Sequence, residues 1–226
     1  MDLYGFALEN KEILKLVYAL IIVLVCVVIV FKTNKLFRLS SHNGIRYFRN
    51  AFFFYGIGFV VRYVLGSKMI FPIFPFSVIG VLFEFFFVMA GFFLIYSLMW
   101  KKFESPETDY TSSLFNSKIF IFYVLALLIV VLDSLWSTNT FMFFSQIIVF
   151  AFNSFISYSN HKKRKGKPFL RFYFLAMLLA FFAWVLNAVA EIYFNWNQAI
   201  IINIYILNLV FFLLFLFGVS KIIKPS

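Results

Sequence analysis

The stretch Asn43–Gly66 limits most strongly what this chain can fold into. It reads NGIRYFRNAFFFYGIGFVVRYVLG, an apolar segment of membrane-spanning length with Arg46 and Arg49 at one end and Arg62 near the other. A soluble core does not accommodate three arginines on one apolar segment, whereas in a bilayer an arginine reaches the headgroup layer or pairs inside a helix bundle. The stretch therefore predicts a membrane-spanning helix.

The composition of the whole chain indicates the same class. Of its 226 residues, 64% are hydrophobic and 13% are charged, against about 45–50% and 25% in soluble domains. This length allows one domain, so we expect a single polytopic membrane domain over residues 1–226 and no soluble domain. The single cysteine, Cys26, cannot form an intrachain disulfide.

Apolar runs separated by polar connections predict an all-α integral membrane protein, a seven-helix transmembrane bundle. About 20 apolar residues cross a hydrocarbon core of about 30 Å, because a helix rises about 1.5 Å per residue. The run 119–158 is too long for one crossing, and we divide it at the polar residues 137–140. The predicted spans are 13–31, 46–66, 76–100, 119–136, 141–158, 169–190 and 199–220.

Basic residues predict the orientation of this bundle. In the seven-span topology, 16 of the 20 Lys and Arg lie on one side, which predicts the N-terminus outside and the C-terminus in the cytoplasm. Lys32, Lys35 and Arg38 follow the first span rather than precede it, so we expect a permanent helix and not a signal peptide. We read the net charge of +11 as topology, with anionic lipid and no nucleic acid as partner, in a multi-pass protein of the cell membrane.

An offset of 125 residues relates the two halves of the chain. The fourth span would be a linker between two equivalent groups of three spans, the 3+1+3 pseudo-repeat of parallel-repeat carriers. At this offset the second predicted span aligns with the sixth, with identical residues at Arg46 and Arg171, Ala51 and Ala176, Val60 and Val185, and Val64 and Val189, and with Arg62 aligned to Asn187.

Charged and amide side chains gather in the outer halves of the predicted spans. A charge inside a bilayer is costly unless it is paired or hydrated, so such residues indicate a site. Glu84 is the deepest, about 12 Å below the outer surface at helical rise, and we expect it to pair with Arg62. Gly80 and Gly91 on the same face would allow close helix approach. The predicted ligand-binding residues are Arg62, Glu84, Asp133, Asn187, Glu191 and Asn203.

These residues also have a purely structural interpretation. A single buried ion pair such as Arg62 with Glu84 can fix the register of two helices with no other role. Asp133, Glu191 and Asn203 are near predicted span ends, where polar side chains reach the hydrated headgroup layer. For these three, the structural interpretation is the stronger one.

The sequence contains no motif for catalysis, and we expect neither an enzyme nor a bound cofactor or metal. The seven-span topology resembles that of microbial rhodopsins, but the middle of the last span, 203–208, has no lysine to which retinal would attach. The topology also resembles that of sugar-facilitator and PQ-loop carriers, although no Pro-Gln dipeptide occurs. Seven-helix sensor modules of bacterial and archaeal signalling proteins are similar in length.

Three functions fit these patterns. A receptor-like or sensory protein would bind a small polar species in an outward-facing pocket and signal to a cytoplasmic protein partner. A small-solute or ion carrier would use Glu84 as its coupling carboxylate. A structural or assembly subunit of a membrane complex would bind no ligand. A carrier site is expected near the midplane, whereas a site confined to the outer half favours sensing.

Overall fold

The computed structural model describes residues 11–40, 42–67, 75–103, 114, 117–136, 138–163, 168–194 and 198–223. Secondary structure in these ranges is entirely helical. The α-helices are α2 (Lys11–Ser40), α3 (Asn43–Phe59), α4 (Phe76–Phe103), α5 (Ser117–Trp136), α6 (Thr140–Lys163), α7 (Pro168–Phe194) and α8 (Gln198–Ile223). A π-helical segment, η1 (Val60–Leu65), continues α3 without a break.

Six of these helices, all except α3, are long and apolar enough to cross a membrane. Many large apolar side chains on the outside of the bundle are more than half exposed, among them Leu20, Phe31, Phe120, Ile148 and Phe155. A protein in water does not present so continuous an apolar surface, whereas lipid covers it. The described chain therefore has the architecture of a polytopic membrane protein. That all seven helices cross the membrane stays a prediction, because α3 alone has 17 residues and spans more only together with η1.

Each predicted span coincides with a helix, the second with α3 and η1 together, and most of the helices extend beyond the apolar runs. The largest difference is in α2, which continues to Ser40, past the predicted end at residue 31. The chain stays helical through the polar residues after 31, because the helix satisfies its own backbone hydrogen bonds both in lipid and in the headgroup layer. The hydroxyl of Thr33 donates back to the carbonyl of Ile29 at 2.6 Å.

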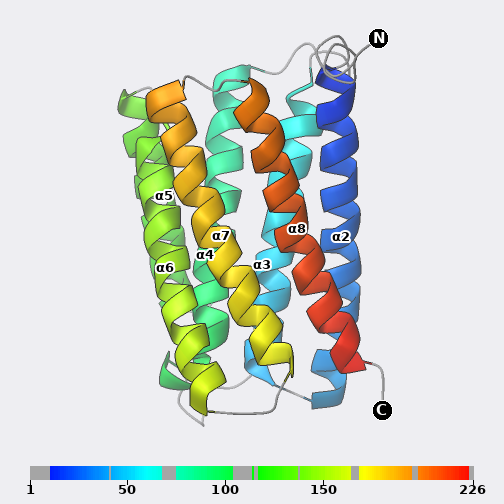
Figure 1. Ribbon diagram of the computed structural model, residues 1–226. Coiled ribbons are helices and arrows are strands. Elements are labelled where there is room, and N and C mark those ends of the chain that lie inside the picture. The colour runs from blue at the N-terminus through cyan, green and yellow to red at the C-terminus, as the bar shows by residue number, and fades with distance from the viewer. Residues whose placement is uncertain are drawn as a thin grey trace, which may run out of the picture.

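The helices run side by side and alternate in direction (Figure 1), and their contacts form a ring with one helix outside it. Around the ring, α2 packs on α3, α3 on α4, α4 on α6, α6 on α7, α7 on α8, and α8 again on α2. Helix α5 packs mainly on α4 and α6, and its Tyr123 ring also lies 6.5 Å from the ring of Phe54 in α3. Its buried residues form a single stripe of Ile119, Ala126, Val130 and Asp133. The ring therefore consists of α2–α3–α4 and α6–α7–α8.

Basic side chains concentrate at one end of this ring. We call the end at which α2 begins the upper end, and the end at which α8 finishes the lower end (Figure 1). By their positions in the helices, Lys15 and Arg62 lie toward the upper end. The lower end has Lys32, Lys35, Arg38, Arg46, Arg49, Lys101, Lys118, Lys162, Arg171 and Lys221. This is the segregation on which the predicted orientation depends.

Two of the lower-end cations connect helices of the ring. The ammonium of Lys32 in α2 donates to the hydroxyl of Ser220 in α8 at 2.6 Å. The Nη1 of Arg49 in α3 donates to Oδ1 of Asn34 in α2 at 2.7 Å. At the lower end, charge-assisted hydrogen bonds thus hold α2 to both α8 and α3.

Small residues allow close helix approach at only some of the predicted positions. A Cβ at Gly91 would lie 2.9 Å from Oε1 of Gln146, so α4 and α6 approach closely there. The prediction for Gly80 is wrong, because no atom of the described residues lies within 4 Å of a Cβ placed at that position. Gly80 belongs to the first turns of α4, where Val81 and Leu82 are exposed. Along α7, steps of four, three and four residues from Ala176 through Ala180 and Ala183 to Asn187 define one helix face. All four residues are buried, so this is an interior face.

Candidate functional site

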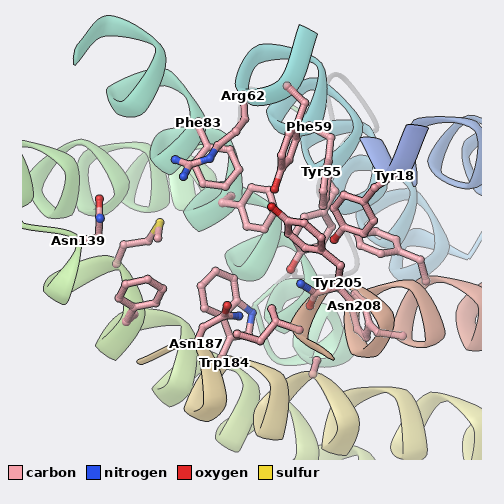
Figure 2. Close-up of a pocket in the computed structure, with 18 of the residues that line it drawn as sticks. Tyr18, Tyr55, Phe59, Arg62, Phe83, Asn139, Trp184, Asn187, Tyr205 and Asn208 are labelled. Atoms are coloured by element: carbon pink, nitrogen blue, oxygen red, sulfur yellow. The ribbon is translucent and has the colours of Figure 1, made fainter. Parts of the chain in front are cut away.

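A cavity of about 290 Å³ lies inside the ring. Every helix of the ring contributes to its walls, and α5 does not. The cavity extends from Lys15 and Arg62, toward the upper end, to Tyr55, Ala180 and Phe212, near the middle of their helices. Figure 2 shows Arg62 on one side of this space and Trp184 and Asn187 on the other.

Aromatic rings form one wall of the cavity. Tyr18 of α2 stacks on Tyr205 of α8 with ring centroids 4.4 Å apart and planes at 20°. The ring of Tyr18 also makes edge contacts with the rings of Phe59 and Tyr63, each at a centroid distance of 5.8 Å. Phe59 and Tyr63 in turn stack on one another at 5.8 Å. Such offset and edge contacts are the favoured geometries of aromatic pairs, and they hold this wall rigid.

The π-helical segment η1 determines where Arg62 lies. The wider turn is closed by the N–H of Gly66, which donates to the carbonyl of Val61, five residues earlier, at 3.1 Å. π-Helical turns inside α-helices are often found at functional sites. The guanidinium carbon of Arg62 lies 4.6 Å from the ring centroid of Phe83, a cation–π contact.

The predicted ion pair between Arg62 and Glu84 is not formed. Although the two groups interact electrostatically, Arg62 contacts the ring of Phe83 instead. Phe83 and Glu84 are consecutive in α4, so their side chains diverge by about 100° around the helix axis. Phe83 lines the cavity and Glu84 does not.

Besides the side chains of Lys15 and Arg62, the polar groups that line the cavity are hydroxyls and amides. Asn139, Asn187 and Asn208 contribute side-chain amides, and the Tyr18 hydroxyl lies beside Asn208. The hydroxyl of Tyr55 is buried and has no hydrogen-bond partner. Among the lining residues that the structure describes there is no Asp or Glu. The cavity is therefore aromatic and rich in hydrogen-bonding groups, and the guanidinium of Arg62 is part of its wall.

Residues 125 apart line this cavity together. Six such pairs contribute to its walls: Tyr18 and Phe143, Tyr55 and Ala180, Phe59 and Trp184, Arg62 and Asn187, Phe83 and Asn208, and Phe87 and Phe212.

Ring contacts follow the same offset. The rings of Tyr18 and Phe59 are 5.8 Å apart, and the corresponding Phe143 and Trp184 are 5.9 Å apart. The contact between the rings of Phe59 and Phe212, at 5.7 Å, corresponds to the contact between Trp184 and Phe87, at 5.9 Å.

The six predicted site residues separate into two groups. Arg62 and Asn187 line the cavity. Three others are near the same upper end of the bundle but do not line the cavity: Glu84, Asp133 and Glu191. The side chain of the sixth, Asn203, is outside the described residues. The ligand-binding role of all six stays a prediction.

Asp133 caps a helix. Its residue is 1% exposed, and its Oδ1 and Oδ2 accept from the backbone N–H groups of Phe141, at 2.9 Å, and Met142, at 2.7 Å. These N–H groups are in the first turn of α6, where no helical carbonyl is available to them. A carboxylate is stabilised there by the helix dipole and by two charge-assisted hydrogen bonds. The geometry thus favours the structural interpretation of Asp133.

Glu191 and Glu84 surround Asp133 at the upper end. The Nδ2 of Asn139 donates to Oε1 of Glu191 at 3.3 Å, while Oε2 of Glu191 is buried without a partner. Glu84 is 7% exposed, and its carboxyl group interacts electrostatically with Asp133, Arg62 and Glu191. In the described ranges, no group of His, Cys, Asp and Glu side chains is arranged to hold a metal ion. None of the three acids is among the lining residues, although Glu84 and Glu191 interact electrostatically with Arg62, which is.

Most of the cavity wall was not predicted from the sequence. Tyr18, Tyr55, Trp184 and Tyr205 are aromatic residues in a chain with 37 Phe and 12 Tyr, so none of them is conspicuous. The one signal that points to them is the 125-residue offset, which relates Tyr18, Tyr55 and Trp184 to other lining residues. That signal becomes visible only when the lining is known.

The sequence and the fold were also compared with known proteins. No family model, curated protein or solved structure matches the chain. What the protein does is therefore inferred from its own residues and their geometry. Its six long apolar helices place it among polytopic membrane proteins.

Proposed function

We propose that the protein is a small-solute carrier of the cell membrane, with seven membrane spans, the N-terminus outside and the C-terminus in the cytoplasm. The observation that supports it is the position of the cavity between α2–α3–α4 and α6–α7–α8, lined by residues at a constant offset. Parallel-repeat carriers place their substrate site at the interface of two such halves.

The proposal includes an internal duplication of the 3+1+3 type, with α5 as the linker helix outside the ring. Several features support it besides the paired lining residues. Helix α3 begins at residue 43 and α7 at residue 168, which is the same offset of 125. Phe48 and Tyr173, also 125 apart, touch each other with ring centroids at 5.8 Å. Equivalent residues that touch each other are expected only next to a two-fold axis, here along the membrane normal.

The depth of the cavity favours transport over sensing. Its floor is formed by Tyr55, Ala180 and Phe212, about halfway along their helices, which is where carriers bind their substrates. Below the floor, buried aromatic rings such as Phe48, Tyr173 and Phe215 fill the ring. In a carrier, this arrangement corresponds to the state that is accessible from one side.

A receptor-like protein is the second candidate. The same aromatic packing below the cavity is the observation that favours it, because a sensor needs access from one side only. Its signal would leave through the basic lower end toward a cytoplasmic protein partner. Binding without transport would distinguish this candidate from the carrier.

Uptake into proteoliposomes tests the proposal. Ala180 is the small counterpart of Tyr55 at the cavity floor, so Ala180→Phe should fill the cavity and abolish uptake of any transported solute. Ala151→Phe is the matched control, since Ala151 is exposed on the outside of α6 and can accept a ring in lipid. Equal uptake by both variants, or no uptake of any solute by the wild type, contradicts the carrier.

A further inference from the structure

We propose that the cavity binds a small aromatic anion, with its acidic group at Arg62 and its ring among the tyrosines. If the protein is the proposed carrier, the bound anion is the solute that it transports. It assigns a chemical class to the cavity from charge, volume and unsatisfied hydrogen bonding.

The sign of the charge follows from the lining. Arg62 and Lys15 both contribute to the walls, and no described lining residue is an acid. Arg62 forms no ion pair with any carboxylate in the described ranges, and its contact is with the ring of Phe83. A cationic ligand would meet the guanidinium of Arg62, whereas a carboxylate can accept the two parallel N–H bonds that this guanidinium offers.

The volume of the cavity and the rings in its walls indicate the size and the flat shape of the ligand. A cavity of about 150 Å³ lined by apolar side chains holds one benzene ring, and this cavity has about 290 Å³. By proportion it accepts about twelve non-hydrogen atoms. Tyr18, Tyr205 and Trp184 offer ring faces and edges on which a planar ligand packs more favourably than a bulky one.

A second polar group of the ligand is indicated at the floor. The residue Tyr55 is 2% exposed, it lines the cavity, and its hydroxyl has no hydrogen-bond partner. A buried hydroxyl without a partner is costly, and a ligand that bonds to it recovers that cost. Tyr55 is at the floor and Arg62 is toward the upper end, about two helical turns later in the same helical segment. A ligand with an acid at one end and a hydroxyl at the other matches this separation.

Three related probes test these assignments by equilibrium dialysis against the purified full-length protein. 4-Hydroxybenzoate has both the charge and the hydroxyl, 4-hydroxybenzamide lacks the charge, and benzoate lacks the hydroxyl. In the wild type we expect 4-hydroxybenzoate to bind about tenfold or more tightly than the amide, and several times more tightly than benzoate.

Two variants connect each preference to one residue. Arg62→Gln should reduce the preference for the acid over the amide to about twofold, while binding of the amide is unchanged. Tyr55→Phe should remove the preference for 4-hydroxybenzoate over benzoate. Arg38→Gln and Tyr158→Phe are the matched controls, because both residues are exposed and do not line the cavity. A loss of folding would lower the binding of all three probes equally and leave the preferences unchanged.

The outcomes separate this inference from the carrier proposal. If the amide binds as well as the acid, if Arg62→Gln leaves the acid preference unchanged, or if none of the probes binds, the inference is overturned, while uptake of another solute would still support a carrier. If 4-hydroxybenzoate binds with a preference that depends on Arg62 but is not taken up by proteoliposomes, the inference holds and the carrier fails.

Discussion

At the scale of single residues, the charged groups of the upper end have different roles. Arg62 lies in the cavity wall over the ring of Phe83, whereas Asp133 is bound to the first turn of α6. Both were predicted as members of one site because both are charged and at the same depth. The backbone geometry, which the sequence pattern does not contain, separates them.

Asp133→Asn should lower the free energy of unfolding by about 1–2 kcal/mol, because a charge-assisted cap becomes a neutral one. Denaturation of the detergent-solubilised protein measures this change. Glu191→Gln is the control and should cost less, since Glu191 has a single contact at 3.3 Å with Asn139. Binding of 4-hydroxybenzoate should remain within about twofold in both variants. An Asp133→Asn variant that is as stable as the wild type but binds no probe would instead place Asp133 in the site.

Glu84→Gln should strengthen binding of 4-hydroxybenzoate by about fivefold or less, and leave 4-hydroxybenzamide unchanged. The carboxyl group of Glu84 interacts electrostatically with Arg62 without lining the cavity. Removing a negative charge that is near the cavity but not in its wall should make the binding free energy of an anion more favourable by about 1 kcal/mol. Weaker binding of both probes would show that Glu84 contacts the ligand. Normal binding with lost uptake would support its role as coupling carboxylate.

At the scale of elements, η1 connects backbone geometry to the cavity. The wider turn directs Arg62 over Phe83, and its closure requires the chain to pass very close to itself at Gly66. A Cβ at Gly66 would overlap the backbone carbonyl oxygen of Arg62. The glycine is therefore needed for the close approach of backbone to backbone.

Gly66→Ala should disturb the π-helical turn, move Arg62 and weaken binding of 4-hydroxybenzoate by about tenfold. Gly80→Ala is the matched control, because a Cβ at Gly80 meets no atom within 4 Å in the described part of the chain. In α4 the added methyl should stabilise the helix by up to about 1 kcal/mol and leave binding unchanged. Equal binding by both variants would contradict the importance of the turn. The dialysis assay and thermal denaturation measure the two effects.

At the scale of the whole molecule, the proposed axis predicts which contacts open during transport. Phe48 in α3 and Tyr173 in α7 touch each other below the cavity. The double variant Phe48→Cys and Tyr173→Cys, with Cys26 replaced by Ala, allows a short thiol cross-linker to hold the lower end closed. Uptake should be lost after cross-linking and restored after cleavage of the linker, while probe binding persists. Each single-cysteine variant, treated in the same way, is the control. Full uptake in the cross-linked protein would contradict opening at this contact.

The proposed orientation has a separate test. Thr138, between α5 and α6, is exposed at the upper end, and Lys118, at the start of α5, is exposed at the lower end. In a Cys26→Ala background, an impermeant maleimide should label Thr138→Cys on intact cells and Lys118→Cys only after permeabilisation. The physical reason for this expectation is the concentration of Lys and Arg at the lower end, because basic loops favour the cytoplasmic side. The reverse labelling pattern would invert the topology.

The sequence alone determined the helices and the distribution of charge along them. Apolar runs of membrane length must satisfy their backbone internally, so each of the predicted ranges is helical. Basic residues alternate with the spans, and their segregation to the lower end follows once the helices alternate in direction. The buried alanine stripe of α7 was also predictable, because steps of three and four residues define one helix face.

Only the tertiary structure decided which residues line the cavity. Glu84 and Phe83 are neighbours in sequence, yet a rotation of about 100° per residue turns one to the cavity and the other away from it. The π-helical turn of η1 changes the face on which Arg62 lies, and no residue pattern indicates that turn in advance. The exclusion of α5 from the ring is equally a result of packing between helices. Helix formation in lipid is a local property of the chain, whereas the direction of a side chain inside a ring depends on all its neighbours.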